Sequence, residues 1–439
     1  MTLPGDSRPS VAIIGAGWAG LACALRLARK GFKPVVLESA PEPGGRARRA
    51  HIQHQWRDNG QHLMLAGCTA LTQLFDEIGI TLPRVSFAYT DGHRTLSLAG
   101  RPGQTGLLWA LLRAHGFSWR ERLALMRALF ILRRCGWCAP VKQTVMQWLQ
   151  AQRQPTALIE RFWTPLALAI LNTPIEQAAM CRLAPVLRDT LGAGGDALAM
   201  LQPPTDLSTS IISPWVNRIE FAGGRVLCGQ RVSAVERSAQ GRLTVRTRLA
   251  ESQHDACHTF DQVVLAVPPW ALPHMALPVD TTPLTDDFGA QPIATVYLGF
   301  DADVRLPTPL VQLTGPTDGD ARIWAMDRAH CGEPGVIALS LSAEGPWLTL
   351  NTDALVACCI RNLQTVVGPQ VCRWHRVVNV RRATPDATPN ACLPPEKRQP
   401  MPGLWLCGDW THPEYPATLE AAVQTGFAVA EKIIRIFSL

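Results

Sequence analysis

Three glycines and one carboxylate stand at fixed spacings near the start of the chain. Gly15, Gly17 and Gly20 follow the apolar run 11–14, and Glu38 closes a second apolar run. Gly15 permits a tight turn, Gly17 lets the backbone approach a pyrophosphate, and Gly20 allows a helix to pack closely on a strand. The N-terminus of that helix favours phosphate charge, and a carboxylate at the position of Glu38 accepts hydrogen bonds from a ribose. The pattern therefore predicts a strand–helix–strand unit that binds a dinucleotide.

A second glycine-rich segment follows, in which Gly44 and Gly45 precede Arg46 and Arg48. It resembles the GGR segment of the glutathione-reductase-like flavoproteins, where glycines and an arginine lie along the flavin diphosphate. A nicotinamide-binding fold has no need of such a segment, so the resemblance favours FAD. The alternative interpretation is an ordinary basic loop.

The C-terminal region carries a third pattern, in which a strand runs into Gly408 and Asp409 and the segment 416–426 opens a final helix. It resembles the flavin amine oxidase and phytoene or carotenoid desaturase superfamily, where the aspartate contacts the ribityl chain and the helix points its N-terminus at the flavin pyrimidine. A helix N-terminus stabilises the negative charge that this ring edge gains on reduction. The segments 229–235 and 262–269 resemble the strand that contacts adenine and the strand that returns to the nucleotide domain.

A polar pentapeptide, Asp58 to His62, follows the GGR region directly. In the superfamily the corresponding loop passes close to the flavin ring, where Gly60 permits close approach of the backbone. Together with the run 161–174 and the C-terminal motifs, this pentapeptide resembles the hydroxysqualene dehydroxylases, also described as squalene-associated FAD-dependent desaturases of hopanoid pathways. The resemblance covers nearly the whole chain.

The resemblance implies that reduced FAD removes the hydroxyl group of hydroxysqualene, a long isoprenoid, and that an unidentified reductant renews the flavin. This chemistry needs an acid that assists departure of hydroxide, a low-polarity cavity and a hydride from the cofactor. Our hypothesis for the acid is His62, with Asp58 orienting it, because histidine titrates near neutrality. The alternative is that the pentapeptide only shapes its loop. For Asn172 and Thr173 we prefer termination of a helix before Pro174 to contact with substrate.

The residues that the resemblance assigns to FAD come from distant stretches that are expected to converge on one cofactor. They are Gly15, Gly17, Trp18, Ala19, Gly20, Glu38, Gly45, Arg46, Arg48, Gly60, Gln61, Val232, Gly408, Asp409, Thr418 and Leu419. Three other functions stay open. A carotenoid or phytoene desaturase would use the flavin oxidatively. A flavin amine oxidase would need an aromatic cage, for which Trp374 and Trp410 are the only obvious aromatics. A protein of another class would only bind or present a lipid.

These motifs require an α/β fold (α+β overall), with a glutathione-reductase-like Rossmann domain that is discontinuous in sequence. We assign this FAD-binding domain to residues 1–85, 215–275 and 396–439. The inserted substrate domain comprises a helical part, 86–214, and a sheet part, 276–395. Alternating apolar runs in the sheet part are typical of strands, which we expect to roof the active site.

Composition limits the remaining interpretations. The 439 residues are 47% hydrophobic and 18% charged, which predicts a folded protein with large cores. The net charge is +7, but the basic residues are spread out, so we expect no nucleic acid partner. Apolar stretches are cut by arginine well short of the roughly 20 residues that span a bilayer. The 13 cysteines lack the spacing of a disulfide framework or a metal site, which favours the cytoplasm and predicts no bound metal.

The segment 118–134 predicts an amphipathic helix with a basic stripe. Trp119, Leu123, Met126 and Phe130 share one face at helical spacing, beside a stripe of three arginines. That stripe consists of Arg120, Arg127 and Arg134. One interpretation is peripheral contact with the anionic inner face of the cytoplasmic membrane, where a squalene-sized substrate dissolves. The other is a core helix with a solvated basic edge.

Overall fold

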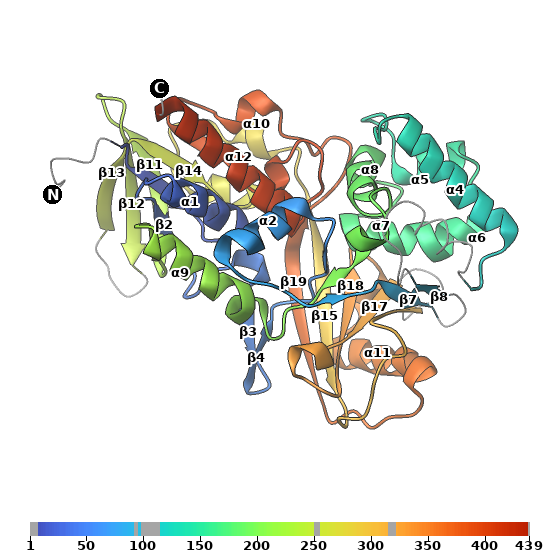
Figure 1. The fold of residues 1–439 in the computed structure, drawn as a ribbon. Helices are drawn as coiled ribbons and strands as arrows, with labels where there is room; N and C mark the ends of the chain where they lie inside the picture. Colours follow the sequence, from blue (N-terminus) through green and yellow to red (C-terminus); the bar gives the residue numbers. More distant parts are fainter. Residues whose placement is uncertain (1–7, 92–94, 98–114, 250–254, 315–321, 438–439) are drawn as a thin grey trace.

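A five-stranded parallel sheet forms the centre of one half of the molecule, as the computed structural model shows for residues 8–91, 95–97, 115–249, 255–314 and 322–437 (Figure 1). Its strands lie in the order β10-β2-β1-β14-β20. Their bounds are β1 Val11–Ile14, β2 Val35–Leu37, β10 Arg225–Leu227, β14 Gln262–Leu265 and β20 Leu404–Leu406. All four pairings are parallel. Segments from both ends and the middle of the chain therefore build one sheet.

Alternate residues of β1 face two different layers. Val11 and Ile13 pack with helices, whereas Ala12 and Ile14 pack with a three-stranded meander. This alternation follows from the two-residue period of a strand. The helices are α1 Trp18–Arg29, α2 Thr69–Ile78, α9 Ser213–Phe221 and α12 Leu419–Phe437, and the meander is β11 Gln230–Arg237, β12 Leu243–Leu249 and β13 Asp255–Phe260. The sheet is thus covered by helices on one face and by the meander on the other, in keeping with the burial of both faces of parallel sheets.

The closest helix packing in this half is between α1 and α12. A Cβ atom on Gly426 would lie 2.2 Å from the carbonyl oxygen of Ala19, and a Cβ on Gly20 would lie 2.0 Å from that of Gly15. Only glycine fits at either position. The backbone of α12 therefore touches that of α1, and the backbone of α1 touches the turn at Gly15.

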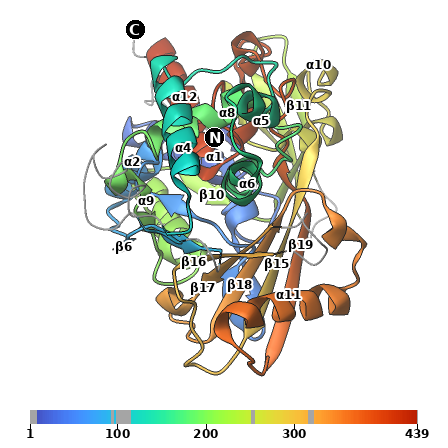
Figure 2. The ribbon, with the colours of Figure 1, turned by 90° about the vertical axis from the view of Figure 1, so that its right-hand side faces the viewer.

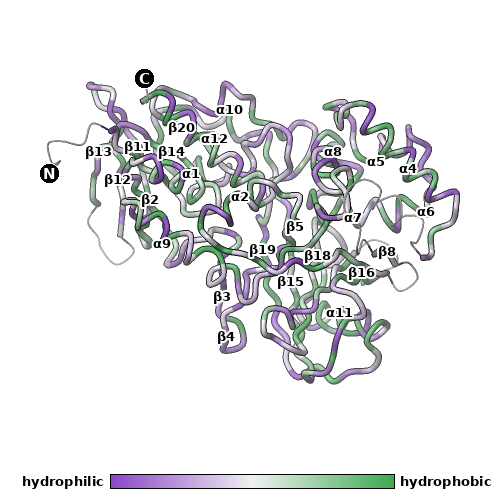
Figure 3. The backbone as a smooth tube through the Cα atoms, viewed as in Figure 1, coloured by the Kyte–Doolittle hydropathy of each residue, from purple (hydrophilic) through white to green (hydrophobic). Residues whose placement is uncertain are grey.

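A second, seven-stranded sheet forms the other half, in the order β19-β15-β18-β17-β16-β7-β8. Its strands are β7 Ala88–Thr90, β8 Thr95–Ser97, β15 Ala290–Gly299, β16 Leu310–Thr314, β17 Arg322–Asp327, β18 Val336–Ser342 and β19 Trp374–Pro385. Helix α11, Thr352–Val367, packs on one face of it. Hydrophobic residues gather where β15 and β18 pair and around α1 and β14 (Figure 3).

The helical part lies at one end of the molecule, above the seven-stranded sheet (Figure 2). It contains α4 Trp119–Arg134, α5 Val145–Ala151, α6 Thr156–Leu158, α7 Thr164–Leu171 and α8 Met180–Asp189. Asn172 ends α7 in the left-handed conformation, at φ 45°. This agrees with the interpretation that the segment before Pro174 terminates a helix. Within the ranges that the structure describes, no helix has the length and apolar composition to cross a membrane.

Short elements link the two halves of the molecule near the polar pentapeptide. The hairpin of β3, Arg49–Ile52, and β4, Gln55–Asp58, runs directly into the polar pentapeptide. Beyond it lies a small sheet of β5 Met64–Leu65, β6 Arg84–Val85 and β9 Met200–Leu201. The short helix α10, Thr282–Thr285, leads into β15.

Candidate active site

Two glycine segments touch at the N-terminus of α1. The amide of Gly44 donates to the carbonyl of Ala16 at 2.8 Å, and a Cβ on Gly45 would lie 3.0 Å from Cα of Gly17. A Cβ on Gly17 would meet nothing within 4 Å, so the space before the helix is open. No side chain caps the helix N-terminus. Its amides are therefore available to a phosphate group, as the sequence predicts.

The carboxylate of Glu38 closes the end of β2 beside this turn. Its two oxygens accept hydrogen bonds from the amides of Ala16 and Ala40, each at 2.8 Å. The carbonyl of Glu38 accepts from the amide of Gln230, which begins β11 two residues before Val232. The structure thus places the predicted ribose and adenine contacts on adjoining segments.

The basic segment and the C-terminal motif meet directly. Nη2 of Arg46 lies 2.5 Å from Oδ2 of Asp409, and Nη1 donates to the carbonyl of Ala383 at 2.9 Å. Gly408 has φ 150° and precedes this aspartate at the end of β20. Arg48 follows the single turn that carries Arg46. Segments about 360 positions apart in the sequence therefore converge on one place.

The N-terminus of α12 is fixed to α2. Leu419 is the first helical residue, and the hydroxyl of Thr418 accepts from the amide of Ala421 at 3.2 Å. The buried carboxylate of Glu420 accepts from the amides of Ala70 and Leu71, at 2.8 and 2.9 Å, in the first turn of α2. Glu420 thereby orients the helix that is expected to face the flavin. The sequence did not single out this residue.

The arrangement fits FAD. The open glycine turn suits a diphosphate, and Trp18, which packs edge-on against Trp215, has a buried indole N–H without a partner. Among the described residues, no group of three His, Cys, Asp or Glu side chains has the arrangement of a metal site.

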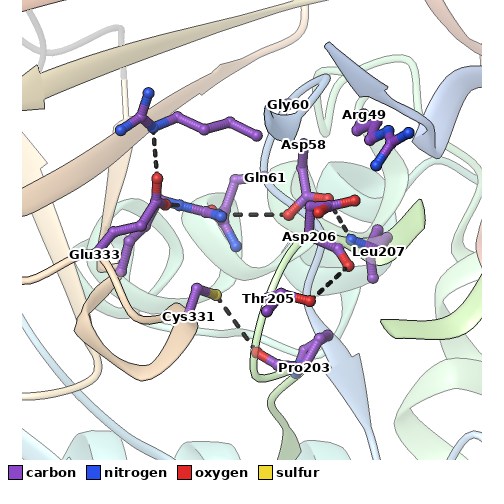
Figure 4. Close-up of polar contacts among 12 residues, drawn as sticks. Arg49, Asp58, Gly60, Gln61, Pro203, Thr205, Asp206, Leu207, Cys331 and Glu333 are labelled. Atoms are coloured by element: carbon purple, nitrogen blue, oxygen red, sulfur yellow. Dashed lines mark hydrogen bonds and ion pairs between the residues drawn. The ribbon is translucent and has the colours of Figure 1, made fainter. Parts of the chain in front are cut away.

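The polar pentapeptide begins at Asp58, the last residue of β4, and Figure 4 shows its Asp58, Gly60 and Gln61. Asp58 is 5% exposed, and its Oδ1 accepts from the amide of Leu207 at 2.7 Å. The Tyr297 hydroxyl on β15 donates to the carbonyl of Asp58 at 2.8 Å. Gly60 has φ 103°, and the Cβ that a larger residue would have there lies 3.6 Å from the hydroxyl of Thr295. The loop is therefore packed against the second sheet, which is the sheet that we expect to roof the active site.

A buried set of four charges supports this loop. Nη1 of Arg328 donates to Oε1 of Gln61 at 3.0 Å and lies 3.5 Å from Oδ2 of Asp58. Oε2 of Glu333 accepts a hydrogen bond from Nε of Arg328 at 2.5 Å, and Oε1 of Glu333 forms an ion pair with Arg57, whose Nε lies 2.6 Å away. When Asp58 is ionised, two cations and two anions sum to zero, and such pairing reduces the cost of burying charges.

Burial shifts the pKa values of the two candidate catalytic groups in opposite directions. It raises the pKa of Asp58 to about 6, because the cost of burying the carboxylate outweighs the attraction of Arg328. It lowers the pKa of His62 to about 4, and the positive charges of Arg46 and Arg328 contribute. The Nε2 atom of His62 is buried without a partner, although the residue as a whole is partly exposed.

These contacts bear on the roles expected from the sequence. The carboxylate of Asp58 is engaged by Leu207 and Arg328, and its role in orienting His62 stays a prediction. His62 is uncharged near neutrality, whereas the carboxyl group of Asp58 titrates closer to it. Arg328 and Glu333 belong to no local motif, so the sequence does not single them out.

Asp58, Gln61, His62 and Arg328 line one small cavity of about 10 Å³. The rest of its wall is mostly apolar, and includes Leu63, Met200, Leu201, Pro203, Leu207 and Met326. The cavity therefore joins a titratable carboxyl group to an apolar surface.

Two groups of named proteins are similar to the chain over nearly its whole length. Hydroxysqualene dehydroxylase of Zymomonas mobilis subsp. mobilis is 26% identical, covering 95% of this chain and 97% of its own. The protein of that name from Rhodopseudomonas palustris is 28% identical, covering 97% and 98%. The 15-cis-phytoene desaturase of Narcissus pseudonarcissus is 24% identical, covering 98% and 80%.

Solved structures share the fold. A putrescine oxidase variant has a TM-score of 0.73 at 16% identity, covering 98% of this chain and 99% of its own. Cyclohexylamine oxidase from Brevibacterium oxydans has a TM-score of 0.68 at 16% identity, covering 98% and 100%. These similarities confirm the predicted fold class. The model of the family described as flavin containing amine oxidoreductase matches residues 18–434. The chain therefore belongs to the flavin containing amine oxidoreductase family and is an FAD-dependent oxidoreductase.

Proposed function

We propose that the protein reduces hydroxysqualene to squalene and water. The observation that carries this proposal is the position of Asp58, a buried carboxyl group with a pKa of about 6, at a cavity that is also lined by apolar residues. Loss of hydroxide from an alcohol needs a proton, whereas desaturation of a hydrocarbon has no oxygen to protonate. The similarity to hydroxysqualene dehydroxylases supports the same substrate.

In this proposal Asp58 donates the proton and His62 provides an uncharged polar group beside it. Arg46, Asp409 and the N-termini of α1 and α12 hold FAD, which in its reduced form supplies a hydride. The physiological reductant is a separate partner that the geometry does not identify.

A phytoene-type desaturase is the second candidate, because a named phytoene desaturase is 24% identical over 98% of the chain. The two reactions move electrons in opposite directions. The test is to reduce the purified protein without oxygen and add hydroxysqualene, and separately to offer phytoene and a quinone to the oxidised protein. Flavin reoxidation with squalene formation supports our proposal. Desaturation of phytoene without any reaction of hydroxysqualene would replace it by the second candidate. Reduction of the oxidised protein by an amine alone would favour an amine oxidase.

We also propose that α4 contacts the anionic inner face of the cytoplasmic membrane. Trp119, Leu123 and Phe130 are 71%, 65% and 62% exposed, while the opposite side of α4 packs in the core through Leu125 and Leu132. The outward apolar side lies beside exposed arginines at positions 120, 127 and 134. Exposed aromatic residues with a basic border are typical of helices that lie in a membrane interface. An apolar substrate would reach the protein there.

A further inference from the structure

We infer that the small cavity beside the polar pentapeptide is the site that receives the departing oxygen, and that Gln61 and His62 bind this oxygen as hydroxyl and then as water. The inference rests on the proposed function and adds a substrate-recognition site to it. It also gives Gln61 a role toward substrate in place of the contact with FAD expected from the sequence.

The size and chemistry of the cavity suit one oxygen atom. Its volume is about 10 Å³, close to the minimum of about 10–15 Å³ that holds one water molecule, which also needs two to four polar partners. Asp58, Gln61, His62 and Arg328 supply polar groups to its wall, which also contains Gln202, His330 and apolar residues such as Met326.

The hydrogen bonds of these residues leave suitable groups available. Oε1 of Gln61 accepts from Arg328, and this fixes the side-chain amide so that its NH₂ group is left to donate. Nε2 of His62 is buried without a partner. A buried polar atom of this kind costs stability unless a ligand or water satisfies it. The bound oxygen would accept from Gln61 and pair with His62.

The reaction balances with these groups. The carbon–oxygen bond breaks, and the oxygen keeps the bonding electron pair and takes the proton of Asp58, forming water. The carbon accepts a hydride, which carries two electrons, from reduced FAD, and the cofactor becomes oxidised. Solvent then returns a proton to Asp58. Arg328 stays protonated and hydrogen-bonded throughout, and it acts as a positioning residue through Gln61.

The same site gives selectivity for an alcohol over a hydrocarbon. Squalene and phytoene have no oxygen to place in the cavity, so they would leave Gln61 and His62 without partners. A site built to hydrogen-bond a hydroxyl group rejects an analogue that lacks it, because its polar groups are left unpaired.

The test replaces Gln61 with Met, which has a similar length and no hydrogen-bonding amide. Gln61→Ser is a second variant in case Met disturbs the loop, and Gln177→Met is the matched control at an exposed position. Binding of hydroxysqualene and of squalene is measured on the oxidised holoenzyme through the change in flavin absorption. We expect the native protein to prefer the alcohol. We expect both Gln61 variants to lose about five- to tenfold of that preference, the effect of one hydrogen bond, with squalene binding and the free flavin spectrum unchanged.

The inference is overturned if the native protein binds both compounds equally, or if both Gln61 variants keep the full preference. A changed flavin spectrum with an unchanged preference would show that Gln61 contacts the cofactor. This result would also overturn the inference. Reoxidation of the reduced native protein by hydroxysqualene is recorded separately. If hydroxysqualene does not reoxidise the native protein, the proposed function is contradicted. If it does, but the variants keep the full preference, only the oxygen site is contradicted.

Discussion

Nη1 of Arg328 lies 3.0 Å from Oε1 of Gln61 and 3.5 Å from Oδ2 of Asp58. One guanidinium, just after β17 of the second sheet, thus holds two side chains of the polar pentapeptide. Arg328 attracts the ionised form of Asp58, but burial outweighs this attraction and raises the pKa of the carboxyl group to about 6. The proposed proton donor, Asp58, is therefore positioned by a residue 270 positions away in the sequence.

Substitution Asp58→Asn should remove the proton donor. The rate at which hydroxysqualene reoxidises the reduced protein should fall by about a hundredfold or more, the usual contribution of a general acid. In the native protein this rate should decrease as pH rises through about 6, because the carboxyl group is protonated only below its pKa. His62→Gln should keep that pH dependence, since His62 is already uncharged there. Stopped-flow absorbance from pH 5 to 8 measures both. A native profile without a decline above pH 6 would rule out Asp58.

Substitution Arg46→Ala should weaken FAD binding. Loss of a charge-assisted hydrogen bond costs about 1.5–3 kcal/mol, or roughly ten- to a hundredfold in Kd. Arg376→Ala is the control, because Arg376 is exposed on β19. Titration of apoprotein with FAD, followed by flavin fluorescence, gives both affinities. Equal affinity in the two variants would show that Arg46 does not reach the cofactor.

Substitution Glu333→Ala should strongly destabilise the fold. It leaves the buried charges of Arg57 and Arg328 without their shared partner, at a cost of about 3–5 kcal/mol in the free energy of unfolding. Asp301→Ala breaks a comparable but exposed pair with Arg373 and should cost about 1 kcal/mol or less. Urea unfolding of the holoproteins measures the difference. Similar losses in the two variants would contradict the role of burial.

Membrane contact through α4 should depend on both its apolar and its basic residues. Replacing Trp119 and Phe130 by Ser should abolish most binding to vesicles that contain anionic lipid. Replacing Arg120 and Arg127 by Gln should weaken binding mainly at low salt, where charges are least screened. Phe221→Ser, at an exposed position on α9, is the control. Sedimentation with vesicles that is equal in all variants would place the contact elsewhere.

The sequence predicted the nucleotide-binding half well, because its glycines and carboxylate act within short segments. Gly15, Gly17 and Glu38 belong to one strand–helix–strand unit, where local spacing decides geometry. Support for the polar loop depends instead on contacts between distant segments. Arg328 and Tyr297 reach Asp58 only after the second sheet has formed, so local patterns could not reveal them. The pKa order of Asp58 and His62 follows from burial, which the sequence does not specify.

The most direct test of the proposed reaction is product analysis after one turnover. Protein with a known amount of reduced FAD is mixed with hydroxysqualene in the absence of oxygen, and squalene is quantified. Our account predicts one squalene for each flavin reoxidised in the native protein. Asp58→Asn should give little squalene on the same timescale while still binding FAD. Reoxidation without squalene, or no reoxidation at all, would contradict it.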